Sequence, residues 1–178
     1  MNSSSPILTL GNPILREQAR PVDCLNSPQL QRLIDDLVAT TAEANGVGLA
    51  APQMGYSIQV LVIASRPNLR YPHAPTMEPT ALINPRLVSH SDEQDKGWEG
   101  CLSVPGVRGR VSRYREVEVE YIDRWGRTQR QVWQDFVARI FQHEADHLAG
   151  KVFLDRLESE VDLISEEAFQ RLVVAGQM

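Results

Sequence analysis

Residues 142–147 read Gln142-His143-Glu144-Ala145-Asp146-His147. In a helix, His143 and His147 lie one turn apart on one face, with Cβ atoms roughly 5–6 Å apart, so both imidazoles can bind one metal ion. Glu144 follows at about 100° around the helix, where a carboxylate can exchange protons with a water at the ion. The pattern His-Glu-x-x-His therefore indicates metal-assisted hydrolysis. The alternatives at this point are a chance match and a histidine pair that serves packing alone.

The motif lies in a predicted helix from 135 to 149, which Gly150 ends. One stripe of this helix contains Phe136, Ile140, His143 and His147. A second stripe contains Val137, Phe141, Ala145 and Leu148, and the polar remainder is Asp135, Arg139, Gln142 and Asp146. Because so much of its surface is apolar, we expect this helix to be central and buried. Asp146 then needs a buried partner, and we expect Arg113.

Other elements are predicted from local signals. A helix over 27–45 begins with Ser27 as N-cap and Pro28 at its first position, and apolar residues follow with helical spacing. Strands are expected at 58–63, 81–85 and 87–88, and an antiparallel hairpin at 117–133. We expect irregular structure over 1–26, a proline-rich loop over 65–80, a charged turn over 91–96 and a final peripheral helix over 160–174.

Composition limits the class of protein. The 178 residues are 42% apolar and 23% charged, as in an ordinary globular domain, and the length predicts one domain. The net charge of −5 argues against a specific nucleic-acid partner, although the arginines of 108–115 could form a local basic patch. No apolar run is long enough to span a membrane, and residues 1–6 do not resemble a secretion signal or a transit peptide. Two cysteines favour a reducing compartment, so we expect a cytoplasmic protein; a processed organellar form would look the same.

Two further stretches carry candidate functional residues. In Gly46-Val47-Gly48-Leu49-Ala50-Ala51-Pro52-Gln53, two glycines allow a close backbone approach, so the segment is either a plain connection or an edge against which a ligand lies. In Trp98-Glu99-Gly100-Cys101-Leu102-Ser103, Cys101 is either a buried structural cysteine or the third ligand of the histidine pair. Three protein ligands and one open position are typical of a catalytic metal site. Glu99 is a candidate for a carboxylate that forms a hydrogen bond with a metal ligand and orients it.

These three stretches, in this order, closely resemble peptide deformylase, and the similarity extends from 10–15 to 148–156. The resemblance implies an α+β fold in which short antiparallel or mixed sheets surround a central buried helix with the metal-binding motif, with an N-terminal and a C-terminal helix. It implies one catalytic domain over 1–178. It also implies an enzyme that hydrolyses the formyl group from the formyl-methionine of nascent polypeptides and releases formate.

The resemblance also implies the roles of the site residues. Cys101, His143 and His147 would bind one divalent metal ion, typically Fe(II), with zinc, nickel or cobalt as substitutes. Glu144 would take a proton from the attacking water and deliver it to the leaving amine. The Gln53 side-chain amide and the Leu102 backbone N–H would donate to the developing oxyanion.

For the substrate, we expect a formyl-methionyl nascent peptide, with transient ribosome association and a monomeric enzyme. The residues expected at the substrate are Val47, Gly48, Glu99, Arg108, Phe136 and Ile140. Of these, Gly48 would pair with the peptide backbone and Arg108 would help to anchor it. Ala145 stands where the family usually has a larger apolar residue, and the loop over 65–80 is longer than the family minimum.

Two alternatives remain open on sequence alone. A zinc metallopeptidase shares the motif, but its third histidine would fall on Phe153, and a downstream glutamate would have to be Glu166 or Glu167. A non-catalytic module with a closed metal site would need a fourth protein ligand, for which Cys24, His73 and His90 are available.

Overall fold

The computed structural model describes residues 6–68 and 70–176, so residues 1–5 of the predicted irregular opening lie outside it. The described helices are α1 (Pro28–Glu43), α2 (Asp135–Leu148) and α3 (Glu166–Val174). The described strands are β1 (Gly48–Ala50), β2 (Val60–Ile63), β3 (Thr80–His90), β4 (Gln94–Cys101), β5 (Val104–Tyr114), β6 (Glu116–Ile122), β7 (Thr128–Gln134) and β8 (Leu163–Ser165). Short 3-10 turns include η2 (Ala51–Met54) and η4 (Glu160–Asp162).

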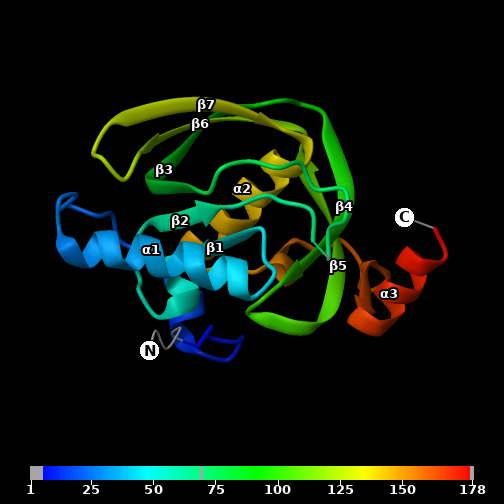
Figure 1. Cartoon of the computed structure of the whole chain (residues 1–178). Helices are drawn as coiled ribbons and strands as arrows, with labels where there is room; N and C mark the ends of the chain where they lie inside the picture. The colour runs from blue at the N-terminus through cyan, green and yellow to red at the C-terminus, as the bar shows by residue number, and fades with distance from the viewer. Residues whose placement is uncertain (1–5, 69, 177–178) are drawn as a thin grey trace.

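The strands form two antiparallel sheets. One has the order β1-β2-β3-β6-β7 and the other the order β4-β5-β8. The helix α2 contacts strands of both sheets, and Figure 1 shows it enclosed by them, with α1 and α3 on opposite sides of the molecule. This confirms the expected α+β fold around a central helix. β3 is longer than the strands expected in its place and β5 was not predicted; each has 11 residues.

The central helix is buried as its sequence predicts. Ala138, Ile140, Phe141 and Leu148 lie in one apolar core with side chains of β2 and β6. Beyond Leu148 the chain turns at Gly150, whose φ of +70° is a conformation that favours glycine. A Cβ there would also lie 2.7 Å from the carbonyl oxygen of Arg16. Packing as well as backbone conformation therefore requires glycine at the predicted end of the helix.

Local signals predicted α1 and the β6–β7 hairpin correctly. Ser27 Oγ accepts a hydrogen bond from Leu30 N at 3.1 Å, and Pro28 occupies the first turn. On β6, Val117, Val119 and Tyr121 are buried and alternate with partly exposed residues, which is the period of a strand with one solvated face.

The region from 80 to 115 differs from the prediction. The two expected strands at 81–85 and 87–88 are one strand, β3, with an irregular register between Ile83 and Arg86. The expected charged turn over 91–96 is shorter, because β4 begins at Gln94. The arginine-rich run lies in β5, where Arg108 and Arg113 are buried against carboxylates. The predicted basic patch was therefore wrong for these two residues.

The C-terminal helix is shorter than the predicted range of 160–174. Residues 163–165 form β8, which pairs with β5, and Ser165 caps α3 by accepting a hydrogen bond from Ala168 N at 3.1 Å. Only Phe169 of this helix is buried, so α3 is peripheral as expected. No helix in the described part of the chain has the length and apolar character that a membrane crossing requires.

Candidate metal centre

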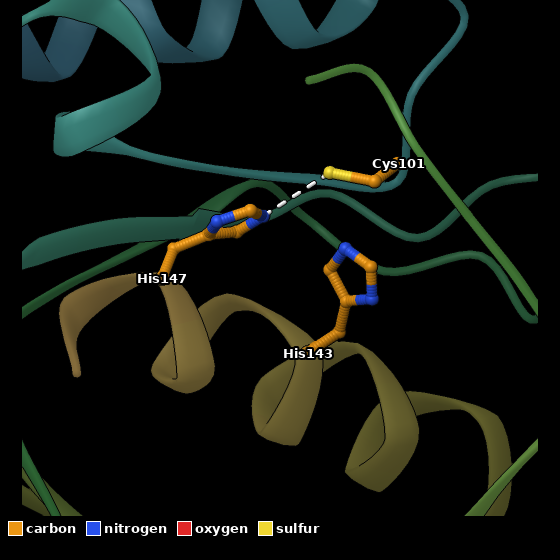
Figure 2. Close-up of side chains that lie close together, drawn as sticks. All are labelled: Cys101, His143 and His147. Carbon is orange, nitrogen blue, oxygen red and sulfur yellow. Dashed lines mark hydrogen bonds between the residues drawn. The ribbon is translucent and has the colours of Figure 1, made fainter. Parts of the chain in front are cut away.

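The helix α2 and the end of β4 bring three possible ligands together. His143 and His147 project from α2 with ring centroids 5.3 Å apart, and Cys101 is the last residue of β4. Cys101 Sγ lies 3.2 Å from His147 Nε2 (Figure 2). One ligand atom from each residue lies within 4.8 Å of the other two, and all three residues are buried. The predicted ligands therefore converge.

The chemistry of these three side chains fits a metal ion. Burial by itself raises the pKa of the Cys101 thiol, but the neighbouring His147 and His143 outweigh burial and hold that pKa well below its usual value. The thiolate, rather than the thiol, binds metals. A thiolate with two imidazoles is a common donor set for zinc and similar transition metals and leaves a position open in a tetrahedral site.

Glu99 fixes the orientation of His143. Burial alone raises the pKa of the Glu99 carboxyl, but Arg113 and the hydrogen bond with His143 hold it far below its usual range, so the group is ionised. An ionised carboxylate only accepts hydrogen bonds. His143 Nδ1, 2.9 Å from Glu99 Oε2, must therefore carry a proton, and when the neutral ring binds a metal its Nε2 supplies the lone pair.

Glu144 is buried beside the ligand pair. Burial raises its pKa to about 7, while the charges of His143 and His147 oppose this rise. Among the described residues, no group forms a hydrogen bond with Glu144 Oε2, although this oxygen is fully buried. A buried carboxylate oxygen without a protein partner is rare, and here it is free to contact a water or a substrate.

Gln53 also lies against the thiol. Its Oε1 accepts a hydrogen bond from Ala50 N at 2.8 Å, which fixes the amide orientation. Its Nε2 is 3.1 Å from Ser103 Oγ and 3.6 Å from Cys101 Sγ. Leu102 follows Cys101 directly, so its backbone N–H is one residue from the thiol. Both expected oxyanion donors are thus beside the three ligands, and their roles stay predictions.

Gly48 brings a strand edge against Glu144. It begins β1, which is an edge strand because it pairs only with β2. A Cβ at Gly48 would lie 2.7 Å from Glu144 Oε1 and 2.9 Å from Ile140 Cγ2. The segment is therefore more than a connection, because only glycine allows the edge strand to approach Glu144 this closely.

Three of the residues expected at the substrate lie together, and their role in binding a substrate side chain stays a prediction. Val47, Phe136 and Ile140 line one small cavity of about 30 Å³ together with His143 and Glu144. The other lining residues are Tyr71, Trp98, Glu99, Gly100 and Arg139. The sequence analysis did not identify Tyr71 and Trp98 as pocket residues. Tyr71 comes from the proline-rich loop, and its ring centroid is 5.1 Å from that of Phe136.

Arg108 is engaged within the protein. Its side chain is fully buried and donates to Glu166 Oε2 at 2.7 Å and to the Tyr71 hydroxyl at 3.0 Å. It does not line the cavity beside His143. A role of Arg108 in holding a peptide stays a prediction.

The structure confirms one predicted partner and adds another residue. Arg113 donates to Asp146 Oδ2 at 2.7 Å, as expected, and also to both oxygens of Glu99. Arg139 was placed on the polar face of α2, yet it is buried and donates to Glu99 Oε1 at 2.9 Å. The only sequence signal for this contact is an arginine one turn before His143.

The two glutamates that a metallopeptidase could use as a third ligand are paired with arginines away from Cys101, His143 and His147. Glu166 pairs with Arg108, and Glu167 is largely exposed beside Arg171. Within residues 6–68 and 70–176, Cys101, His143 and His147 are the only group of three or more His, Cys, Asp or Glu residues placed to hold a metal ion. The geometry therefore favours an open, three-ligand site over a closed structural one.

Comparisons with known proteins agree with this geometry. Residues 4–162 match the family model described as polypeptide deformylase. The chain is 59% identical over 168 residues to peptide deformylase 2 of Nostoc sp., with 94% of each chain covered. It is 46% identical over 151 residues to peptide deformylase 1 of Bordetella pertussis, with 85% of this chain and 86% of that one covered. It is also similar to the Met-Ala-Ser-bound crystal structure of a class I type b peptide deformylase from Acinetobacter baumannii, with a TM-score of 0.86, 46% identity and coverage of 88% of this chain and 100% of that chain.

Proposed function

Because the chain belongs to the polypeptide deformylase family, we propose that Cys101, His143 and His147 hold the metal ion of this hydrolase. Enzymes of this family remove the N-terminal formyl group from nascent polypeptides, and this chain is one of them. The observation that carries the assignment is the convergence of the three buried ligand atoms within 4.8 Å, with Glu144 next to one of them on α2. The remaining roles follow from this centre.

The ion in the cell is Fe(II) under this proposal, and zinc, nickel or cobalt can replace it. Thiolate and imidazole donors suit all four metals, so the donor set supports a transition metal without choosing among them. A divalent ion at this site would act as a Lewis acid on the formyl carbonyl and would lower the pKa of water. The protein supplies the proton transfer, the oxyanion donors and the substrate alignment.

Glu144 is the general base and then the general acid. With its raised pKa near 7, the carboxylate can take a proton from water as it attacks the formyl carbon and can return it to the leaving amine. Its Oε2 has no other hydrogen-bond partner among the described residues, which supports this assignment. The bond between the formyl carbon and the amine nitrogen breaks, and formate and the free amino terminus are released.

Gln53 and Leu102 stabilise the oxyanion. The Gln53 amide is held by Ala50, so it is oriented before substrate arrives, and preorganised donors are the main source of such stabilisation. The N–H of Leu102, the residue after Cys101, provides a second donor.

The substrate lies along the edge of β1. An extended peptide adds to an open strand edge through backbone hydrogen bonds, and Gly48 allows it to lie next to Glu144. The methionine side chain then enters the space between Val47, Phe136 and Ile140, and these side chains must move apart to admit it, because the cavity there has a volume of only about 30 Å³. The relative from A. baumannii binds the peptide Met-Ala-Ser, which supports a methionyl peptide as the ligand of this chain.

Formate release is the direct test. The protein is prepared anaerobically, loaded with Fe(II) or Co(II), and incubated with formyl-Met-Ala-Ser while formate is measured. The expected result is one formate per peptide hydrolysed by the wild type, and release that is about 10²–10⁴-fold slower from Glu144→Gln that retains its metal. Absence of formate from metal-loaded wild type would refute the proposal.

The cellular setting is also part of the proposal. We infer one catalytic domain over 1–178 that acts as a monomer in the cytoplasm and associates transiently with the ribosome as nascent chains emerge. Sedimentation of the purified protein and its co-sedimentation with translating ribosomes test these points.

A further inference from the structure

Arg139 connects the central helix to the three-stranded sheet. It lies one turn before His143 on α2, and its side chain is only 9% exposed. Its guanidinium donates Nη1 to Glu99 Oε1 at 2.9 Å and to Val111 O at 2.8 Å, and donates Nη2 to Asp95 O at 2.7 Å. The arginine is thus held at both nitrogens by acceptors on β4 and β5.

The contact with Glu99 is the informative one. Glu99 Oε1 accepts from Arg113 Nε and from Arg139 Nη1, both at 2.9 Å, while Oε2 accepts from Arg113 Nη2 and His143 Nδ1. The helix therefore contacts this carboxylate twice, through residues four positions apart. Two contacts from one rigid helix set both the position of the carboxylate and the angle of the His143 ring, which one contact could not do.

Gly97 provides the space for this arrangement. A Cβ at Gly97 would lie 2.9 Å from Arg139 Nη2 and 3.0 Å from Cζ. The guanidinium cannot simply move aside, because Asp95 O and Val111 O hold it. A glycine on β4 and an arginine on α2, 42 positions apart in the chain, thus form a matched pair.

We propose that Arg139 is a positioning residue for His143, that it acts through Glu99, and that Gly97 is required because it admits the guanidinium. The proposal rests on the proposed function of His143 as a metal ligand. It predicts that damage to either member of the pair weakens metal binding in the same way, although neither residue is a ligand.

The test measures Co(II) binding to the apoprotein by visible absorption in competition with a chelator. The variants are Arg139→Met, which keeps the apolar stem, Arg139→Lys, which keeps the charge, Gly97→Ala and the double variant. Arg124→Met is the matched control, since Arg124 pairs with Gln31 and Asp35 away from the site. Thermal unfolding verifies that each variant is folded.

The expected result is Co(II) binding about 10–100-fold weaker in Arg139→Met, as for other residues that orient a metal ligand. Arg139→Lys should recover part of this loss, and Gly97→Ala should weaken binding while the arginine is still present. Because Arg139→Met and Gly97→Ala damage the same interaction, the double variant should bind Co(II) no more weakly than Arg139→Met. With formyl-Met-Ala-Ser, kcat should fall while KM stays within about twofold.

Three results would overturn the proposal. The first is unchanged Co(II) affinity in folded Arg139→Met, and the second is a loss in the double variant that equals the product of the two single losses. The third is a change in KM alone, which would show that Arg139 only lines the pocket. Failure of the wild type to bind Co(II) or release formate would instead refute the proposed function. The two hypotheses are therefore tested separately.

Discussion

His143 Nδ1 lies 2.9 Å from Glu99 Oε2, and this hydrogen bond determines which nitrogen of His143 faces Cys101. Glu99 is ionised and can only accept, so Nδ1 carries a proton, and Nε2 supplies the lone pair when the neutral ring binds a metal. A buried ion pair with Arg113 maintains the charge on Glu99. Glu99, which is not one of the three possible ligands, thus determines which ring nitrogen of His143 is available to a metal ion.

Glu99→Gln should weaken metal binding by about 10–100-fold, because an amide can present its N–H groups to His143 and favour the wrong ring nitrogen. It also leaves Arg113 with one carboxylate partner fewer, so we expect a lower Tm. Metal content after dialysis against a chelator measures the first effect. Full metal retention in a folded Glu99→Gln protein would contradict this role.

Cys101→Ala should abolish metal retention and formate release. The loss of metal affinity should exceed the roughly 10–100-fold loss that is typical when a residue that orients a ligand is removed. Elemental analysis and the formate assay provide the measurements. Glu167→Ala is the control, because Glu167 is largely exposed and pairs only with Arg171 on the same helix. The reverse pattern would favour a metallopeptidase with a downstream glutamate ligand.

Glu144→Gln should retain its metal and lose about 10²–10⁴-fold in kcat, because the amide keeps the shape of the side chain but cannot accept a proton from water. Metal analysis and steady-state kinetics on the same preparation separate the two effects. If the variant loses its metal as well, Glu144 would be a ligand rather than a base.

Gly48→Ala should lower kcat/KM by up to about 10²-fold without loss of metal. The new Cβ would meet Glu144 Oε1 and Ile140 Cγ2 at under 3 Å, so either the base or the strand edge must move, and small displacements of reacting groups have effects of this size. Gly106→Ala is a useful comparison, since no atom lies within 4 Å of its Cβ position, although its φ of +85° will itself cost stability. Activity equal to wild type in Gly48→Ala would show that this edge does not contact the substrate.

Asp123 should make stability depend on pH through the β6–β7 turn. Burial raises the pKa of its carboxyl, but hydrogen bonds from Arg127, Gln129 and Trp125 outweigh burial and lower it. A lowered pKa in the folded state means that the stabilisation is complete above the unfolded pKa of about 3.9 and is lost as the pH falls through the folded value. Asp123→Asn should therefore lower Tm at pH 7 by about 2–4 °C and have little effect near pH 2. An equal change in Tm at both pH values would contradict this explanation.

Sequence alone predicted the elements whose signals are local. The Ser27 cap, the alternation of β6 and the two apolar stripes of α2 each depend on neighbours a few residues away, and the structure contains all three elements. The three residues that converge as possible metal ligands were also predicted, because their spacing and order match one family over nearly the whole chain.

Only the tertiary structure decided which charged residues are buried. The sequence analysis placed Arg108 in a basic run and Arg139 on a polar helix face, and for Arg113 it expected the contact with Asp146 but not the one with Glu99. These arginines are buried because carboxylates from distant positions neutralise them, as Glu166, Glu99 and Asp146 show. Burial of a charge depends on a partner brought close by folding, and no local pattern records that partner. For the same reason, the need for glycine at position 97 is evident only in the folded structure, where Arg139 fills the space that a Cβ would occupy.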